Sequence, residues 1–380
     1  MSLRLVATCV LGLEEILAGE LAALAVGGIE RQKGAVIFSG NWEDAWRANW
    51  RLRAANRVLV ELATWDSADG DALAAGAGRV VESDVEWDGV SGGELLHPTR
   101  TFALRATSSA SRVRDTRWVA LRVKDGLVDA QRRRWGHRAS VQRRQPDVAL
   151  RVWLHRDRAS LLLDTSGESL DHRGYRRVTS AAPVREQLAA ACVLASGWDG
   201  SGPVVDPMCG SGTLLAEAAA WALGLAPGRC RPGFGFERLP GFDPAKWLQV
   251  RREQIPAAGP GVRLHGVDRS PTAIAAAREN LEAAGLGDRA ELTTGDADSF
   301  DPPRGPGLVV VNPAHGERLA EEQDQWPRLG DLLKHRYTGW RAVVLAGGPS
   351  RGRHIGLKPR SRIPVKNGPL DARILVFELY

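Results

Sequence analysis

A short apolar strand, a glycine turn and a helix constrain the fold of this chain more than any other stretch. Val204 and Val205 lead to the acidic Asp206, and the turn Gly210-Ser211-Gly212 opens a helix rich in Ala and Leu. This order is typical of the first ligand-binding loop of nucleotide-binding α/β folds. The turn has no lysine, and Asp206 would repel a pyrophosphate. We therefore predict a nucleotide-type site in which Asp206 meets a cationic or hydroxyl-bearing group.

Apolar strands alternate with helices from residue 204 to the end of the chain. After the glycine turn, strands are expected over 262–268, 290–294, 308–311, 341–346 and 374–379. This pattern predicts a doubly wound, mostly parallel sheet, whose ligands bind at the carboxyl ends of the strands. Capping of the following helices is the alternative role for polar residues at those ends. The residues that we expect to meet in one cleft are Asp206, Asp268, Asp296 and Asn312.

These strand ends favour S-adenosylmethionine over a dinucleotide. Asp268 can accept two hydrogen bonds from a ribose diol, and Asp296 can accept one from a purine amino group. Asp268 follows Gly210 by 58 residues because of a Pro- and Gly-rich insertion at 225–260, whereas a dinucleotide fold has its acidic residue about 20 residues on. The site offers acceptors and no cation for phosphates, which suits a positive sulfonium. The predicted cofactor-binding residues are Asp206, Pro207, Cys209, Gly210, Gly212, Thr213, Asp268, Arg269, Asp296, Ala297 and Asn312.

The predicted catalytic residues are Asn312, Pro313, Ala314 and His315. The side-chain amide of Asn312 and a backbone carbonyl on the proline turn can accept hydrogen bonds from an exocyclic amine. Those bonds would aim the nitrogen lone pair at the methyl group, so catalysis would come from positioning. The ring of His315 can stack on a flipped base.

Residues 1–60 predict a small α+β unit, and the block that follows, up to residue 164, has an α/β ferredoxin-like rhythm. Strands are expected at 3–10, 34–38 and 101–107, helices at 12–24, after Asn41 and at 116–135, and a hairpin over 149–155 and 159–164. Trp42, Trp46 and Trp50 recur at every fourth residue. Such a stripe packs in a core more often than it stacks on bases, so we expect a packing role.

The distribution of charge indicates an anionic partner. The formal net charge is +6. Residues 1–99 carry 8 Lys/Arg and 15 Asp/Glu, whereas residues 100–158 carry 16 and 5. A basic segment of this kind grips phosphates without reading sequence, although a solvated arginine-rich face would look the same. The candidate RNA contacts are Arg112, Arg114, Arg117, Lys124, Arg132, Arg133, Arg134, Arg143 and Arg144, with Arg173 and Arg176, which Glu168 could instead brace.

Several classes of protein are disfavoured by the sequence. No apolar run approaches the roughly 18–20 residues that a bilayer requires, and the N-terminus becomes acidic too early for a signal peptide. The four cysteines include no Cys-x-x-Cys pair, which argues against a zinc site or a disulfide framework. We therefore expect a cytoplasmic protein with no bound metal and no membrane partner.

Seven motifs together resemble one known family. They are Leu163–Arg177, Ala182–Leu188, Asp206–Thr213, Asn312–Arg318 and Lys366–Leu370, with Gly12-Leu13-Glu14 and Val123–Gly126 nearer the N-terminus. The chain is similar, over nearly its whole length, to the THUMP-domain class I RNA methyltransferases, specifically the bacterial large-subunit rRNA guanine-N2 methyltransferase group.

The resemblance implies a fold and an activity. The expected fold class is α/β, a Rossmann-like class I methyltransferase domain with an N-terminal α+β ferredoxin-like and THUMP RNA-binding region. The expected domains are a ferredoxin-like subdomain at 1–60, a THUMP domain at 61–165, a linker at 166–183 and the methyltransferase at 184–380. The implied reaction is S-adenosylmethionine-dependent methylation of guanine N2 in structured RNA, with 23S rRNA as the expected substrate and tRNA as the alternative.

One motif departs from the family pattern. The family has Asn-Pro-Pro-Tyr, and this chain has Asn312-Pro313-Ala314-His315. The backbone carbonyl at residue 313 is retained, and His315 can still stack, although over a smaller ring. Two interpretations follow: an active enzyme with an altered base clamp, or a catalytically weakened relative that binds RNA.

Overall fold

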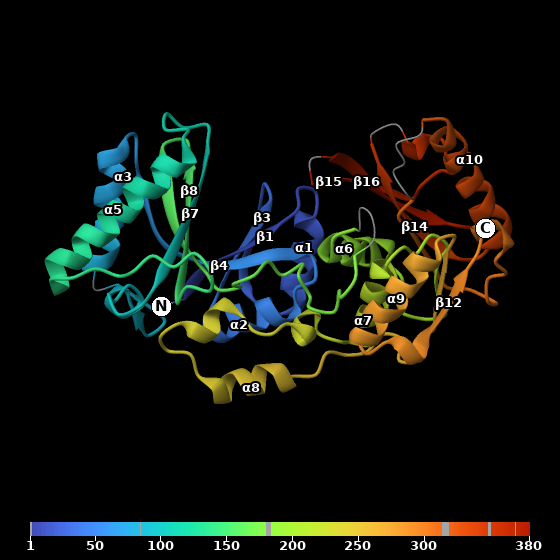
Figure 1. Cartoon of the computed structure of the whole chain (residues 1–380), viewed down its shortest axis with the longest axis horizontal. Helices are drawn as coiled ribbons and strands as arrows, with labels where there is room; N and C mark the ends of the chain where they lie inside the picture. The colour runs from blue at the N-terminus through green and yellow to red at the C-terminus, as the bar shows by residue number, and fades with distance from the viewer. Residues whose placement is uncertain (1, 84, 180–183, 314–318, 349–350, 369) are drawn as a thin grey trace.

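Two seven-stranded sheets form the framework of an elongated molecule (Figure 1). The computed structural model describes residues 2–83, 85–179, 184–313, 319–348, 351–368 and 370–380. The first sheet has the strand order β2-β3-β1-β4-β9-β8-β7, and the second has the order β12-β11-β10-β13-β14-β16-β15. Within those residues, no helix is both long enough and apolar enough to cross a membrane.

The first sheet is built from the N-terminal half of the chain. Its strands are β1 (Leu3–Cys9), β2 (Gly27–Gln32), β3 (Ala35–Gly40), β4 (Ala55–Asp66), β7 (Phe102–Ser109), β8 (Val148–His155) and β9 (Arg158–Asp164). Its helices are α1 (Glu14–Ala23), α2 (Trp42–Arg51), α3 (Gly70–Glu82), α4 (Gly92–Leu95) and α5 (Thr116–Trp135), and a separate pair of short strands comprises β5 (Glu86–Trp87) and β6 (Val90–Ser91).

Strand β4 belongs to both N-terminal units. Its first part pairs antiparallel with β1, with Val60 opposite Leu5, and its second part pairs antiparallel with β9, with Asp66 opposite Arg158. The expected domain boundary at residue 60 therefore falls inside a strand, and the two N-terminal units share one continuous sheet.

Helix α5 spans the predicted residues 116–135. Asp115 caps it by accepting hydrogen bonds from the backbone N–H groups of Arg117 and Trp118, and Gly136 ends it at a φ of +76°. The helix packs closely on α3, because a Cβ added at Gly126 would lie 2.0 Å from the carbonyl oxygen of Ala74. Any larger residue at 126 would push the two helices apart.

The tryptophan stripe of α2 joins the N-terminal half to the 225–260 insertion. Trp46 and Trp50 are buried, and the Trp46 ring stacks on Phe236 with centroids 5.7 Å apart. The Trp50 ring meets Trp247 edge-on at 5.6 Å. The insertion's helix α8 (Pro244–Arg252) lies beside α2 (Figure 1). The expectation that the stripe packs in a core is confirmed.

The second sheet is the predicted doubly wound sheet. Its parallel strands are β10 (Val204–Asp206), β11 (Leu264–Asp268), β12 (Ala290–Thr294), β13 (Leu308–Val311) and β14 (Arg341–Gly347), followed by the antiparallel β15 (Ser361–Asn367) and β16 (Leu370–Glu378). Its helices are α6 (Glu186–Ser196), α7 (Thr213–Ala222), α9 (Pro271–Ala283) and α10 (Leu319–Arg336), and short 3₁₀ turns are η1 (Pro227–Cys230), η2 (Gly235–Arg238), η3 (Gly287–Arg289), η4 (Ala297–Ser299) and η5 (Arg351–Arg353).

Three strands of the two large sheets, β2, β4 and β15, were not expected from the sequence, and neither was the short pair β5 and β6. Strand β4 lies inside the first sheet, between β1 and β9, whereas the other two lie at sheet edges. Strand β2 is at one edge of the first sheet and β15 at one edge of the second. Most residues of β2 are exposed, and β15 is only partly buried. An edge strand that covers little core lacks the apolar run that predicts a buried strand.

Candidate active site

The carboxyl ends of β10 and β13 lie side by side where the strand order of the second sheet reverses. Val205 pairs in register with Val309, so Asp206, the last residue of β10, and Asn312, the first residue after β13, lie at the ends of neighbouring strands. On the other side, Asp206 pairs with Gly266, two residues before Asp268. Ligands of doubly wound sheets bind at such a reversal point. The sheet thus brings three of the four predicted strand-end residues to adjacent positions.

The glycine turn between β10 and α7 has the left-handed backbone that glycine permits. Gly210 has a φ of +52° and Gly212 a φ of +79°. The N–H of Gly212 donates to the carbonyl of Cys209 at 2.8 Å. A Cβ at Gly212 would lie 3.2 Å from the Cβ of Ala277, so the turn sits close against α9. Residue 212 therefore needs glycine for both its conformation and its packing.

The Asp268 carboxylate fixes this turn from the neighbouring strand. One oxygen accepts from the backbone N–H of Gly210 at 2.9 Å, and the other accepts from that of Ser270 at 2.9 Å. Ser270 in turn caps α9 through the N–H of Ala273. Asp268 thus holds the loop and the start of α9 together, while each of its oxygens retains a further acceptor position.

Asp206 is a buried carboxylate with little internal compensation. Its side chain is 1% exposed, and the described residues supply one hydrogen bond, from the N–H of Met208 at 3.1 Å. Burial, and secondarily the charge of Asp268, raise the pKa of Asp206 to about 8. A carboxylate in this condition gains from a cation or a hydroxyl group placed beside it. This property fits a positively charged ligand.

Asn312 presents a second uncompensated acceptor. Its Oδ1 is buried and accepts no hydrogen bond from the described residues, and buried polar atoms normally have partners. Pro313 is buried beside it. The predicted Ala314 and His315 lie outside the described residues, so their roles stay predictions.

The remaining predicted cofactor residues lie in the turn or on the strand ends beside it. Pro207 and Cys209 are buried in the turn, and burial raises the pKa of the Cys209 thiol, which keeps it neutral. Asp296, at the end of β12, accepts from the N–H of Asp298, which lowers the pKa of Asp296, and it pairs with Arg269 at 2.5 Å. Ala297 is buried next to it. Asp296 is therefore an ionised carboxylate that already has partners.

Sequence reasoning missed Asn280, a buried residue on α9. Its amide links Val178 in the linker to the carbonyl oxygen of Ser211 in the glycine turn. A polar residue beside Ala277 and Leu281 on an apolar helix face was the available signal. Thr213 was predicted, but its partner was not: the Arg176 guanidinium donates to the Thr213 hydroxyl at 3.1 Å.

The structure corrects two of the predicted RNA contacts. Arg173 is 2% exposed and donates to the carbonyls of Leu170 and Arg53. Arg176 pairs with Glu186 at 3.0 Å. Both side chains point into the protein, so the prediction that they face RNA is wrong. Glu168, the proposed brace, lies 3.8 Å from His172 instead.

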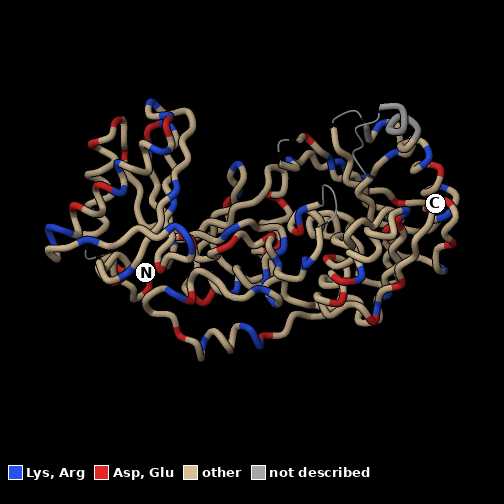
Figure 2. Tube along the Cα trace, viewed as in Figure 1, with Lys and Arg blue, Asp and Glu red and all other residues tan. Residues whose placement is uncertain are grey.

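The other predicted RNA contacts fall into two groups. Arg112, Lys124, Arg132 and Arg133 pair with Asp157, Asp125, Asp129 and Glu82 respectively, and Arg134 donates to the carbonyl of Val81. Arg114, Arg117, Arg143 and Arg144 are exposed and form no ion pair with a described residue. Figure 2 shows basic residues at the outer end of α5, where Arg132–Arg134 lie. The four exposed arginines without a described ion pair are the ones whose charge is available to an external anion.

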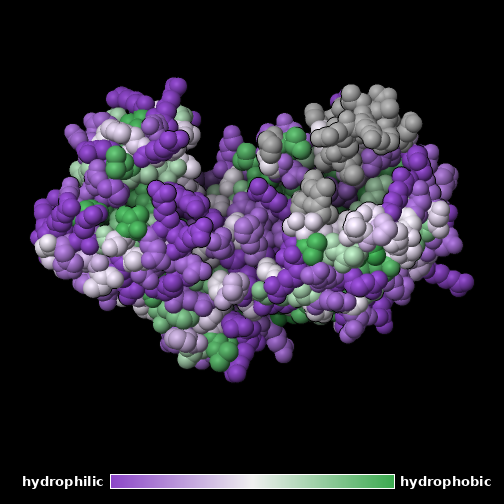
Figure 3. All heavy atoms as spheres, in the orientation of Figure 1, coloured by the Kyte–Doolittle hydropathy of each residue, from purple (hydrophilic) through white to green (hydrophobic). Residues whose placement is uncertain are grey.

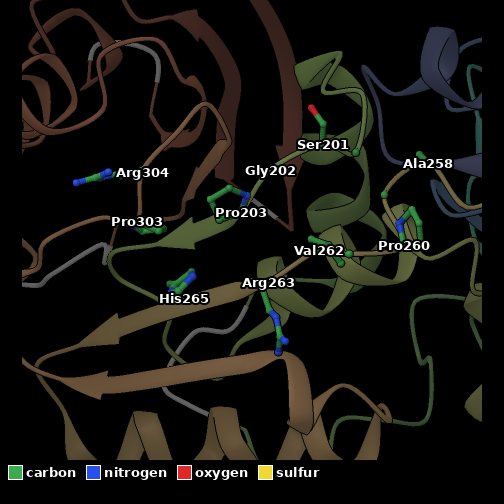
Figure 4. A pocket seen from close by; sticks show the side chains of 13 residues that line it. Ser201, Gly202, Pro203, Ala258, Pro260, Val262, Arg263, His265, Pro303 and Arg304 are labelled. Atoms are coloured by element: carbon green, nitrogen blue, oxygen red, sulfur yellow. The ribbon is translucent and has the colours of Figure 1, made fainter.

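A hollow of about 540 Å³ lies at the amino ends of the strands of the second sheet, opposite the carboxyl ends where the glycine turn lies (Figure 4). Segments that precede β10, β11 and β13 line it, including Ser201, Arg263 and Arg304. The two arginines extend in different directions rather than toward a common point (Figure 4). His265 contacts Glu291 at 3.3 Å. This hollow is remote from the glycine turn, and its cations do not converge on a ligand position.

The fold and the strand-end site define a Rossmann-like methyltransferase domain behind a ferredoxin-like and a THUMP region. The chain belongs to the family described as RMKL-like, methyltransferase domain, whose model matches residues 173–375. The RlmL ferredoxin-like domain matches residues 4–59, and the THUMP domain matches residues 83–164. Family membership and the expected fold class are confirmed. Within the described residues, no group of His, Cys, Asp or Glu side chains could hold a metal ion.

Three relatives illustrate the similarity. The ribosomal RNA large subunit methyltransferase K/L of Allochromatium vinosum is 37% identical over 97% of this chain and 50% of its own length. A Synechocystis protein provisionally named an RNA methyltransferase is 34% identical over 98% of this chain and 96% of its own length. The provisionally named methyltransferase SMU.472, solved with SAH, superposes with a TM-score of 0.87 at 25% identity, over 100% and 98% of the two chains. The chain spans about half the length of the K/L relative.

Proposed function

We propose that this chain transfers a methyl group from S-adenosylmethionine to the N2 amine of a guanine in structured RNA. One observation carries the proposal: Asp206 and the Asn312 Oδ1 are two buried acceptors with few partners among the described residues, and they lie at the ends of neighbouring strands at the reversal point of the sheet. The names of the K/L and Synechocystis relatives support RNA methylation. We propose 23S rRNA as the substrate, with tRNA as the alternative, and the cytoplasm as the location.

The cofactor is S-adenosyl-L-methionine, which supplies an electrophilic methyl group on a positive sulfonium. The residues present fit this group, because the buried Asp206 carboxylate needs a cationic or hydroxyl-bearing neighbour. Gly210 and Gly212 let the backbone approach a ligand closely. Asp268 and Asp296 have acceptor positions for ribose and purine groups. We assign all five residues to cofactor binding.

Asn312 and Pro313 would orient the amine. The Oδ1 of Asn312 accepts one N–H of the exocyclic amine, and the carbonyl of Pro313 accepts the other. When both N–H groups donate to these acceptors, the nitrogen lone pair is the part of the amine that remains unbonded, and it must face the methyl group. Such alignment would accelerate transfer through positioning: the methyl–sulfur bond would break as the methyl–nitrogen bond forms, and the amine would then release one proton to water, so neither residue has to remove a proton beforehand.

RNA is the partner that the surface supports. The visible face is mostly hydrophilic with scattered hydrophobic patches (Figure 3), and the basic residues cluster in the THUMP region. Arginines on such a surface position a polyanion through its phosphates. We propose no metal and no membrane as partners.

Mass-spectrometric mapping of modified guanosines in rRNA and tRNA, with and without this protein, tests the function. We expect N2-methylguanosine at one rRNA site only when the protein is present. RNA binding without incorporation of labelled methyl would support the weakened relative instead. In that case, changing Ala314→Pro and His315→Tyr together should restore incorporation, because it restores the family motif.

Removing Arg143 and Arg144 should weaken RNA binding and reduce its salt dependence. The slope of log K against log salt is negative, and each phosphate contact that is lost reduces its magnitude by about 0.7–0.9. We expect Arg143→Ala/Arg144→Ala to reduce the magnitude of this slope by roughly 1–2, measured by fluorescence anisotropy over a range of salt concentrations. Arg132→Ala/Arg133→Ala is the matched control, because Asp129 and Glu82 already pair with those residues. Equal slopes for all three proteins would contradict this assignment.

A further inference from the structure

The linker between the two halves runs directly against the glycine turn. We infer that Asn280 is a positioning residue that clamps Arg177 and Val178 of the linker onto this turn, so that the linker sets the geometry of the cofactor site. The inference rests on the proposed function, because it concerns how that site binds S-adenosylmethionine.

Asn280 uses its whole amide to make the clamp. It is 2% exposed. Its Oδ1 accepts from the backbone N–H groups of Arg177 at 2.7 Å and Val178 at 3.1 Å. Its Nδ2 donates to the carbonyl of Val178 at 2.9 Å and to that of Ser211 at 3.1 Å. One side chain therefore fixes two linker residues and the centre of the glycine turn.

Arg176 makes a second connection between the same two segments. Its guanidinium donates to the Thr213 hydroxyl, at the first residue of α7, and to the carbonyl of Val184 at 2.8 Å. Glu186 holds the guanidinium from the other side at 3.0 Å. The linker thus contacts both the centre and the C-terminal end of the turn.

The linker is also fixed to the N-terminal half. Arg173, buried in the interior, donates to the carbonyl of Arg53 and lies 3.5 Å from Glu217 on α7. The Tyr175 hydroxyl donates to the same Glu217 at 2.9 Å. Arg231 of the insertion donates to the carbonyls of Glu168, Ser169 and His172. A segment held at this many points cannot shift without moving the N-terminus of α7.

This arrangement has a consequence for cofactor binding. The backbone of the glycine turn can approach a ligand only in the conformation that Gly210 and Gly212 provide. Loss of the Asn280 clamp would free the Ser211 carbonyl and widen the range of turn conformations. Binding would then include the cost of ordering the turn, so the affinity for cofactor should fall.

If Asn280 had only a structural role, its loss would lower stability without a specific loss of cofactor affinity. The chain contains a matched control for this outcome. Asn49 on α2 is 1% exposed and holds the other end of the linker: it donates to Thr165 at 2.8 Å and accepts from Ser166 at 2.6 Å. Its removal should cost comparable stability, but it lies in the N-terminal half and has no contact with the glycine turn.

The test is isothermal titration of the full chain with S-adenosylhomocysteine. We expect Asn280→Ala to raise the Kd by about tenfold or more, the equivalent of one or two hydrogen bonds, whereas Asn49→Ala leaves it within about twofold. Asn280→Asp keeps the side-chain volume and the acceptor but loses the donor to Ser211, so it should also weaken binding. Equal Kd values for Asn280→Ala, Asn280→Asp and the parent would overturn the inference.

Two measurements separate this inference from the proposed function. If the parent chain fails to bind S-adenosylhomocysteine, the proposed function fails before the variants are compared. If Asn280→Ala does not fold, hydrogen exchange on the parent chain decides: adding S-adenosylhomocysteine should slow exchange in residues 176–179 together with residues 209–213. Protection of the turn without the linker would overturn the clamp.

Discussion

The Asn312→Ala variant is expected to lose methyl transfer while it keeps its cofactor. Removing one oriented hydrogen-bond partner of a reacting group costs about 10²–10³ in rate, and the Asn312 Oδ1 has no other described partner that its loss would disturb. We therefore expect single-turnover transfer of labelled methyl to fall at least 100-fold. The Kd for S-adenosylhomocysteine should change by less than about threefold.

Stability provides the control for this variant. The Asn312 Oδ1 has no hydrogen-bond partner among the described residues, so its deletion removes an unsatisfied buried atom rather than a hydrogen bond to them. The melting temperature of Asn312→Ala should therefore stay close to that of the parent, and the activity loss cannot come from unfolding. Turnover at the parental rate would remove Asn312 from the transfer site, and a large fall in melting temperature would assign it a structural role.

The sequence was sufficient for elements whose local signals agree. Strand β13 is apolar throughout and buried, and α5 has a cap, a periodic apolar face and a terminating glycine. The carboxyl-edge residues could be predicted because a parallel sheet places strand ends together whatever the details of packing. These features depend on short-range patterns and on one general rule of topology.

The hydrogen-bond partners of buried polar side chains could not be predicted in the same way. The sequence around Arg173 suggests an exposed polar connector, yet its guanidinium is buried because carbonyls from Leu170 and Arg53 receive it. Arg53 lies 120 residues earlier in the chain, and no local sequence pattern predicts that contact. Asn280 was missed for the same reason, since its partners at 178 and 211 are brought to α9 only by the completed fold.

The net charge of a segment does not identify the arginines that are exposed to an external anion. Sixteen basic residues in 100–158 indicate an anion-binding region, but a count cannot show which of them are neutralised internally. Arg133 reaches Glu82 on α3 because α3 and α5 pack together. The exposed Arg143 and Arg144 lie outside any helix or strand and form no ion pair with the part of the chain that the structure describes. Local composition predicts that the region carries a positive electrostatic field, whereas tertiary packing determines which side chains produce it.

The second large effect is expected from Asp206→Asn in the protein without cofactor. The pKa of Asp206 is raised from 3.8 to about 8 in the folded chain, so the folded state binds this proton more tightly than the unfolded state. The stability associated with the protonated carboxyl is fully present below about pH 4 and is lost as the pH rises to about 8. Asparagine cannot ionise, so the variant should gain stability relative to the parent over that window.

Differential scanning fluorimetry of the two proteins should show this divergence. We expect the melting temperatures to be similar near pH 5 and to separate by roughly 5–10 °C in favour of Asp206→Asn by pH 8, since each pKa unit is worth about 1.4 kcal/mol. Asp296→Asn is the control, because the pKa of Asp296 is lowered and its difference from the parent should be flat from pH 5 to 8. A constant offset for Asp206→Asn across the window would contradict the raised pKa.

The same variant should lose cofactor affinity. The parent gains thermal stability when S-adenosylhomocysteine binds, because a ligand that binds only the folded state stabilises it. Asp206→Asn presents an amide instead of a carboxylate to the hydroxyl-bearing or cationic group, so its stabilisation by the same ligand should be several degrees smaller at pH 8. A variant that is more stable than the parent without ligand, but less stabilised by it, would show that the buried carboxylate lowers stability and contributes to ligand binding. If both proteins gain equally, Asp206 does not contact the ligand.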